Sequence, residues 1–375
     1  MDTEPLKQLY FCFVALLLLS FTAYSQLDIL GRVEDETNNM PLPNACVFFN
    51  NTSIGTNTNQ QGEFYFETVR MLNTELVIYC PGYEPMVYKP NAQQVEGKRM
   101  VFRLRLKSFD PVNKPTLSSG LRRDFLAVFS RNLLGITEEA NRSKIMNDSV
   151  IYFGAGETTT SFRAYADSPL VVINNMLGYK IIFLLEDFWY DDATGQNNFF
   201  GYAHYEELGS DKKFFKNRRN CYYGSTLHFY RSLVAHQLYN EGFGTFLVKT
   251  DSTKMNGLNI GGMIIPVHDS TGLEPISDGD IMYIDSVNNF SIKVDGQLLV
   301  QYNQNTTAKN YLVEKDLFMS GFLPEGVESY IQFKGPLTGI NYAGILNDYN
   351  SVTYSGYWIY ERLANTLPVN YKPDK

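Results

Sequence analysis

Charged and metal-binding residues are scarce in this chain of 375 residues. Charged residues make up 19% of it, and there are only four histidines and four cysteines. The 40 acidic residues outnumber the 32 basic ones, which gives a net charge of -8. A protein that neutralises phosphates needs the opposite sign, so we expect no nucleic-acid partner. Hydrophobic residues make up 44%, with 26 Tyr and 26 Phe, and this composition excludes a disordered chain.

Long apolar runs are also few, and the clearest one lies at residues 11–21. As a helix, at ~1.5 Å per residue, this run spans about 16 Å, well short of the ~30 Å of a bilayer core. It leads to Ala23 and Ser25, small residues of the kind that signal peptidases need before a cut, here at Gln26. We predict a signal peptide at 1–25 and no transmembrane helix after its cleavage. Two acids and one lysine precede the run, so an uncleaved anchor stays an alternative.

Cysteine is too rare for a disulfide scaffold. Cleavage would leave Cys46, Cys80 and Cys221, an odd number that allows at most one internal bridge. Strand alternation puts Cys46 on the outer face and Cys80 toward the core. Side chains directed apart cannot meet disulfide geometry, so we predict that both stay unpaired.

Short alternating segments broken by turn residues fill the region 26–107. About seven strands at intervals of roughly ten residues are typical of a β-sandwich. The clearest runs lie at 29–33, 45–49, 63–68, 75–80, 83–88 and 101–106.

The same region carries an ordered series of motifs. They are GRV at 31–33, MPLPNACV at 40–47, TSIGT at 52–56, TNQQGEF at 58–64 and PGY at 81–83. Together they resemble the carboxypeptidase regulatory-like domain, a transthyretin-like sandwich common in exported proteins of the Bacteroidota. In that family the domain accompanies peptidases, outer-membrane receptors and uncharacterised proteins, and it is not itself catalytic. The resemblance implies an exported, multidomain protein and no peptide cleavage.

Four turn residues of this region have expected roles. Gly55 and Gly62 allow turns with positive φ. Asn44 stands where the family usually has glycine, a change that the left-handed region tolerates. Asn59 stands where aspartate is usual, and the lost charge weakens the case for calcium in that turn.

Residues 108–118, with two prolines, are predicted to be a linker, and 119–375 to form a larger β-rich α+β region with about two helices. The apolar spacing predicts a helix over 121–134 that ends at Gly135. A second helix, capped by Ser225, is predicted to run to about residue 240. The fold class is therefore mainly β, with a seven-stranded transthyretin-like sandwich at the N-terminus.

Two hairpins are predicted in this larger region. The segments 180–185 and 199–205 flank a loop-forming stretch at 191–198. The strands 290–294 and 298–302 are separated by an Asp-Gly pair, a strong hairpin signal. A further strand is expected at 352–360.

This region also resembles an uncharacterised region that follows the regulatory-like domain in exported Bacteroidota proteins. The motifs that carry this resemblance lie at 169–174, 177–181, 223–225, 228–233, 356–358 and 367–371. The resemblance implies no known activity.

His204 and Glu207 have the HxxE spacing with which zinc carboxypeptidases place two ligands. The flanking residues alternate as in a strand, where positions three apart point to opposite faces. We therefore interpret His204 as a strand histidine and predict no metal or other cofactor.

His228, Ser232 and His236 share one face of the second predicted helix. A metal pair or a Ser-His dyad is the functional interpretation. The two histidines are about 12 Å apart along such a helix, too far for one ion. We expect a polar stripe that bonds to neighbouring backbone instead, and no catalytic residue is assigned.

Two charged stretches remain. Lys212, Lys213 and Lys216 with Arg218 and Arg219 are expected to form a solvated loop. The aromatic and acidic stretch at 186–192 is the best candidate for a binding surface.

That surface centres on Trp189, Tyr190, Asp191 and Asp192, because aromatic faces beside carboxylates suit sugars or cationic groups. Core packing of these aromatics is the alternative.

The sequence thus favours a non-catalytic binding or structural protein of the cell envelope, with the sandwich as spacer or docking module. Its partner would be an envelope protein or a glycan. The expected location is the periplasm, the outer-membrane surface or the exterior. Two alternatives stay open: a secreted, peptidase-like hydrolase with its site in 108–375, and an accessory of an outer-membrane uptake or secretion complex. The ligand and the oligomeric state do not follow from the sequence.

Overall fold

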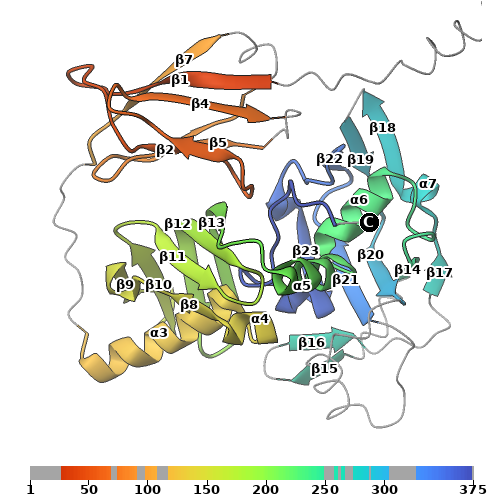
Figure 1. The fold of residues 1–375 in the computed structure, drawn as a ribbon. Helices are drawn as coiled ribbons and strands as arrows, with labels where there is room; N and C mark the ends of the chain where they lie inside the picture. Colours follow the sequence, from red (N-terminus) through yellow and green to blue (C-terminus); the bar gives the residue numbers. More distant parts are fainter. Residues whose placement is uncertain are drawn as a thin grey trace, which may run out of the picture.

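The computed structural model describes residues 27–68, 74–90, 98–107, 117–248, 257–260, 263–266, 273–286, 289–303 and 327–373. The expected signal peptide at 1–25 and most of the expected linker lie outside these residues. Figure 1 shows the N-terminal strands in red and orange above two further groups of strands and helices. Within the described residues, no helix is both long and apolar enough to cross a bilayer.

The N-terminal unit is the predicted sandwich of seven strands. Its first sheet has the order β4-β1-β7, with β1 (Leu27–Asp35) between β4 (Glu63–Thr68) and β7 (Arg99–Leu104). The second has the order β3-β2-β5-β6. Its strands are β3 (Gly55–Asn57), β2 (Cys46–Phe49), β5 (Leu76–Tyr79) and β6 (Met86–Tyr88). Alternate side chains of both sheets are buried against one another, among them Ile29, Val47 and Phe102. This alternation of side chains between the two faces of each sheet is the pattern that predicted the strands.

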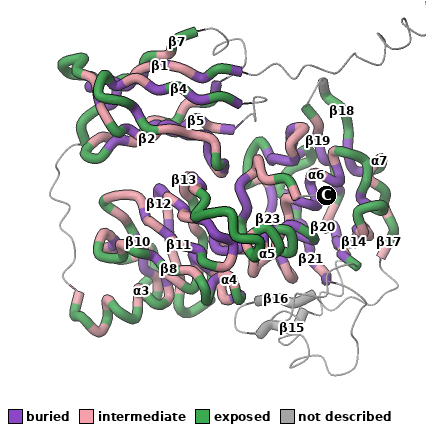
Figure 2. Tube along the Cα trace, viewed as in Figure 1, coloured by how far each residue is buried: buried purple, intermediate pink, exposed green. Residues whose placement is uncertain are grey.

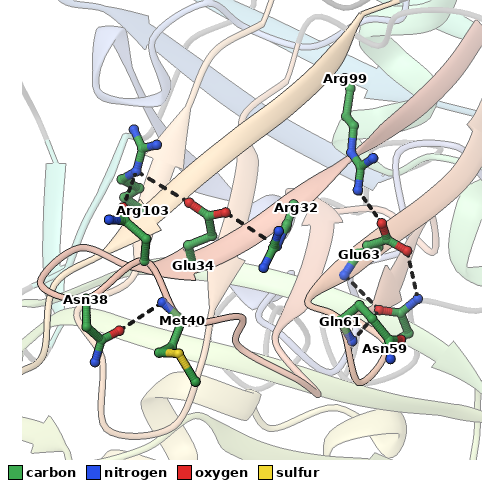
Figure 3. Close-up of polar contacts among 10 residues, drawn as sticks. Arg32, Glu34, Asn38, Met40, Asn59, Gln61, Glu63, Arg99 and Arg103 are labelled. Carbon is green, nitrogen blue, oxygen red and sulfur yellow. Dashed lines mark hydrogen bonds and ion pairs between the residues drawn. The ribbon is translucent and has the colours of Figure 1, made fainter.

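Turn residues of the sandwich behave as expected, with one exception. Asn44 has φ 58° and Gly62 has φ 71°, both in the left-handed region. Gly55 does not have a positive φ. A Cβ there would lie 2.5 Å from the Cβ of Phe48, so glycine is needed for space. Asn59 accepts hydrogen bonds from the backbone N–H of Gln61 and Glu63, and Figure 3 shows this turn closed by its own side chain.

The outer face of the β4-β1-β7 sheet carries a ladder of opposite charges (Figure 3). Glu34 pairs with Arg32 at 3.3 Å and with Arg103 at 3.5 Å, and Glu63 pairs with Arg99. The arginine side chains are 35–55% exposed, so these pairs contribute little to stability.

A six-stranded antiparallel sheet follows the sandwich in the chain and is called the middle sheet. Its order is β8-β11-β12-β10-β9, with β13 on β12. The strands are β8 (Ser143–Ile145), β9 (Ile151–Ala155), β10 (Ser161–Ala166), β11 (Leu170–Asn174), β12 (Tyr179–Asp191) and β13 (Asn197–Glu207). The β12–β13 hairpin confirms the prediction for 180–205. The helix α3 (Ser119–Leu134) buries Phe129 and Leu133 against this sheet and ends at Gly135, as predicted. It is followed by α4 (Glu138–Asn141) and the 3-10 turn η1 (Asp148–Val150).

The C-terminal part contains a five-stranded sheet, a three-stranded sheet and a two-stranded ribbon. The first comprises β17 (Leu273–Pro275), β14 (Phe243–Val248), β20 (Gln297–Tyr302), β21 (Val327–Phe333) and β23 (Val352–Gly356). The second comprises β18 (Met282–Ser286), β19 (Asn289–Ile292) and β22 (Thr338–Asn341), and the ribbon β15 (Gly257–Ile260) and β16 (Met263–Pro266). Their core also takes Phe229 and Leu233 of the helix α6 (Thr226–Val234). Shorter elements are the helix α7 (Asp278–Ile281) and the 3-10 turns η3 (Tyr349–Ser351) and η4 (Tyr357–Tyr360).

The predicted hairpin across Asp295 and Gly296 is wrong. β19 pairs with β18 and β22, whereas β20 pairs with β14 and β21, so the turn joins two different sheets. Ile292 before the turn and Leu298 after it are buried in one shared core. The Asp-Gly pair therefore forms a turn that connects two sheets instead of a hairpin. The burial of both strands decides which strands pair.

The predicted second helix was too long. α6 ends at Val234, and His236 follows with φ 53°. The N–H of Gln237 donates to the carbonyl of Ser232, and the N–H of His236 to that of Leu233. This pattern of a left-handed residue with two backward bonds stops a helix. The expected strand at 352–360 likewise ends at Gly356, where η4 begins.

The basic run expected to be a loop is the helix α5 (Lys212–Tyr222), capped by the side chain of Asp211. Most of α5 is exposed (Figure 2), but Arg218 is only 1% exposed. Its guanidinium donates to the carbonyls of Leu177 and Gly178 and to Glu207, and it lies 3.8 Å from the ring centre of Tyr179. Arg218 thus ties α5 to the turn between β11 and β12. About two helices were expected, and the described part of the chain has five.

We expect Arg218→Lys to lower the free energy of unfolding by about 2 kcal/mol or more, because an ammonium cannot serve two carbonyls and a carboxylate in the guanidinium's geometry. Arg219→Lys, at the exposed neighbouring position, is the control and should stay within about 0.5 kcal/mol. Urea unfolding of both variants is the measurement. Equal midpoints would show that the buried contacts of Arg218 contribute nothing.

Candidate functional site

The loop between β2 and β3 docks the sandwich onto the middle sheet by backbone hydrogen bonds. The N–H of Asn51 donates to the carbonyl of Ala203 at 2.8 Å, and the N–H of Tyr205 donates to the carbonyl of Thr52 at 3.0 Å. Thr52 and His204 pair as in a parallel sheet. The side-chain oxygen of Asn50 also accepts from the N–H of Ala203 at 3.1 Å. Three residues of the turn, Asn50, Asn51 and Thr52, therefore pair with β13 through one β-bridge.

The C-terminal segment also forms hydrogen bonds with this loop. The N–H of Val369 donates to the carbonyl of Asn51 at 2.7 Å. Asn370 exchanges two hydrogen bonds with Ser53, at 3.0 Å and 2.8 Å. Residues 50–53 are thus a junction where three distant parts of the chain meet.

An apolar cluster lies next to this junction. Phe48 and Val77 of the sandwich are fully buried against Leu184 of β12. Cys46 and Tyr79 pack around them, together with Ile182 and Tyr202 of the hairpin. The face of β2 that the alternation pointed away from the sandwich core is therefore covered by the β12–β13 hairpin (Figure 1).

His204 is a structural histidine of the junction, as the strand pattern predicted. Its ring lies 5.0 Å from that of Phe48, and its Nδ1 donates to the carbonyl of Thr52 at 3.2 Å. Burial lowers the pKa of His204, so it is held neutral. Glu207 is exposed and pairs with Arg218 instead. The HxxE spacing therefore builds no pair of ligands here.

The stripe of His228 and Ser232 is also bonded to its surroundings, as expected. The N–H of Gly224 donates to Nδ1 of His228, and Nε2 of His228 lies 3.2 Å from Glu241. Ser232 donates its hydroxyl to the carbonyl of His228, not to an imidazole. Both ring nitrogens are engaged, so His228 forms no dyad with Ser232. His236 lies beyond the end of α6.

The predicted binding residues at 189–192 are distributed over both faces of β12. Tyr190 packs toward the core, with its ring 5.7 Å from that of Phe162. Trp189 is half-buried on the opposite face, across from Arg163 of β10. Asp191 accepts hydrogen bonds from Thr160 and Thr158, and these bonds, chiefly that of Thr160, lower its pKa. Asp192 lies in the exposed loop. Asp192 is thus the exposed member of the four, and Trp189, Tyr190 and Asp191 are each half-buried.

The three cysteines of the predicted mature chain are free. Cys80 lies in the sandwich core and Cys46 in the cluster on the other side of the sheet, as the alternation predicted. The thiol of Cys221 donates to the carbonyl of Asn365, and burial raises its pKa. Among the residues the structure describes, no group of three His, Cys, Asp or Glu side chains is placed to hold a metal ion.

A cavity of about 210 Å³ lies beside the junction. Residues from the sandwich, from β13, from α5 and α6, and from the C-terminal sheet and tail all contribute to its wall. The polar and aromatic members include Asn51, Tyr205, Cys221, Thr226, Tyr230, Tyr349, Tyr354, Glu361 and Asn365. No sequence pattern points to this cavity, because its wall joins residues more than 300 positions apart.

Glu361 is the acidic residue of this wall. Its Oε2 accepts from the N–H of Thr226 at 3.2 Å and from the hydroxyl of Thr226 at 3.1 Å. Burial raises the pKa of Glu361 to about 8. The tyrosine hydroxyls bond within the wall: Tyr205 to Thr366 at 2.7 Å and Tyr230 to Tyr354 at 2.9 Å.

Among the comparisons with known proteins, the family match is confined to the N-terminal unit. A solved structure from Bacteroides fragilis, a protein of unknown function named for a suspected association with membranes, is 12% identical. The match covers 48% of this chain and 95% of that one, but its TM-score is 0.18, so it carries no argument about fold or function. No curated protein matches the chain. Residues 29–110 match the CarboxypepD_reg-like family, and the N-terminal sandwich is therefore a CarboxypepD_reg-like domain.

Proposed function

We propose that this chain is a non-catalytic binding or structural protein of the cell envelope, in which the CarboxypepD_reg-like domain is a docking module. The observation that carries the proposal is the junction at residues 50–53. Backbone hydrogen bonds from this loop reach both β13 and the C-terminal tail. A spacer on a free hinge needs no such contacts, so the domain builds one body with the region that follows it.

The state of the histidines supports a non-catalytic role. His204 and His228 are buried with their polar contacts made inside the fold, as described above. A hydrolase needs a base that can reach its nucleophile. Neither of these two buried histidines is arranged to act as one. We therefore prefer binding to hydrolysis, with an envelope protein or a glycan as the partner.

Export and envelope location are tested in the cells that make the protein. We expect the chain in the envelope fraction, with a mature N-terminus at Gln26 by mass spectrometry. A variant without residues 1–25 should stay in the cytoplasm. Recovery of the full chain in the cytoplasm with its first residues intact would contradict the proposal.

Docking is tested by Leu184→Arg, which places a charge in the apolar cluster of the junction. We expect this variant to lose retention in the envelope fraction while Leu208→Arg, at a position that is 42% exposed, keeps it. Urea melts of both purified variants separate a loss of docking from global unfolding. Equal retention of the two variants would contradict the docking role.

Stability should fall as the pH drops below about 6.5. His204 is neutral when folded and its pKa is lowered, whereas the unfolded chain binds a proton near pH 6.5. Its contribution is therefore complete above that pH and is lost at up to about 1.4 kcal/mol per pH unit below it. His204→Gln should reduce this slope, and His236→Gln, at an exposed position, should not. Unfolding midpoints between pH 5 and 7.5 give both slopes.

We also propose that the predicted stretch meets a glycan or protein partner through Trp189, Asp191 and Asp192, whereas Tyr190 packs toward the core beneath them. Because Trp189 is half-buried, Trp189→Ala should cost less than about 1 kcal/mol and still weaken partner association. Phe188→Ala is the control: that ring is 1% exposed and 4.7 Å from Phe129, so it should cost about 3 to 5 kcal/mol. If Trp189→Ala lowers the free energy of unfolding by a similar amount in a denaturant melt, the proposal for this surface is wrong.

A further inference from the structure

The cavity beside the junction holds a carboxyl group without a positively charged partner. Glu361 is the one residue of its wall whose side chain is an acid of the aspartate and glutamate kind, and the wall contains no lysine, arginine or histidine. Thr226 engages Oε2 of Glu361, and among the described residues no hydrogen bond reaches Oε1. Glu361 is half-buried, and a carboxylate in such a wall is stabilised when it is neutralised or paired.

Helix capping explains only half of this carboxyl group. Thr226 is the first residue of α6, so a carboxylate beside it is favourable. The cap position, however, is already filled by Ser225, whose hydroxyl accepts from the N–H of His228. The second carboxyl oxygen of Glu361, a residue that lines the cavity, is therefore not used by the helix cap.

The rest of the wall suits an organic cation better than a metal ion. Four tyrosines, at positions 205, 230, 349 and 354, line the cavity. Three hydrogen bonds engage their hydroxyls: Tyr205 with Thr366, Tyr230 with Tyr354, and Tyr349 with Asn51. The tyrosines therefore offer mainly their rings. Aromatic faces next to a carboxylate attract ammonium groups, whereas hard metal ions prefer several oxygen ligands.

The volume limits the size of the occupant. The cavity has a volume of about 210 Å³. Pockets for drug-sized ligands are larger, on the order of 300–1,000 Å³. A ligand of a few non-hydrogen atoms fits.

We propose that this cavity binds a small organic ammonium ion, paired with Glu361 and surrounded by the tyrosine rings. The inference rests on the proposed binding role and names a ligand class for it. Because the wall includes Asn51 and the tail, the ligand would also bridge the three parts of the chain that meet at the junction.

Binding should release a proton. Burial raises the pKa of Glu361 to about 8, so the free site is mostly protonated at neutral pH, whereas an ammonium pairs with the ionised form. Glu361 interacts electrostatically with Cys221, Tyr354 and Tyr357. Glu139 acts on Cys221 and Tyr357, and Arg362 follows Glu361 in the chain. Burial raises the pKa of Cys221, Tyr354 and Tyr357, so these three stay neutral between pH 6 and 8. Affinity should therefore rise with pH over this range, by up to about tenfold per unit.

The test is titration calorimetry of the full chain with ethylammonium chloride, with ethanol and sodium chloride as matched probes. We expect ethylammonium to bind, more tightly at pH 8 than at pH 6, and to release protons when two buffers of different ionisation enthalpy are compared. Glu361→Gln should weaken binding about tenfold or more, because it removes the charge that pairs with the ammonium. Glu84→Gln, at an exposed position of the sandwich, should leave it unchanged.

Equal heats for ethylammonium and ethanol, or for ethylammonium and sodium, would overturn the inference. So would unchanged affinity in a folded Glu361→Gln variant. If that variant does not fold, proton release and pH dependence in the unmodified chain still decide. If ethylammonium does not bind but the chain is retained in the envelope fraction, the ligand class is wrong and the proposed function stands. If ethylammonium binding and envelope retention are both absent, the binding role itself is contradicted.

Discussion

The structure depends on one small set of contacts, the hydrogen bonds that residues 50–53 make to β13 and to the C-terminal tail. Without them the CarboxypepD_reg-like domain would be connected to the rest of the described chain only through the segment after residue 107. With them, Phe48 and Val77 are covered by Leu184, and His204 is buried neutral against Phe48. The same loop forms part of the cavity wall, because Asn51 lines the cavity.

These contacts give the domain a role that its family name does not suggest. The family match covers residues 29–110, and it says nothing of chemistry in the region that follows. What the domain does here is physical: it presents an edge loop that extends another sheet, and an outer face that another hairpin covers.

The sequence predicted what local patterns determine. Alternation placed Cys46 and Val47 on opposite faces of β2, and apolar spacing with Gly135 placed α3. It failed where distant groups decide. Arg218 has charged neighbours in the sequence, which predicts exposure, but the carbonyls of Leu177 and Gly178 and the ring of Tyr179 hold its guanidinium in the interior.

The turn at Gly296 has the chemistry of a hairpin, but the burial of Ile292 and Leu298 in one core sends its two strands to different sheets. The cavity could not be predicted from the sequence, since Asn51, Thr226 and Glu361 carry no shared motif. Asp211, a capping residue before α5, was a local signal that could have revealed that helix.

The most direct measurement is hydrogen exchange of the full chain, read at the amides of Asn51 and Tyr205. These two N–H groups donate across the junction, to Ala203 and to Thr52. The docked arrangement predicts that both exchange as slowly as the core of β12, and far more slowly than the exposed loop at 192–196. If they exchange as fast as that loop while β12 stays protected, the sandwich is not docked in solution and the account is wrong.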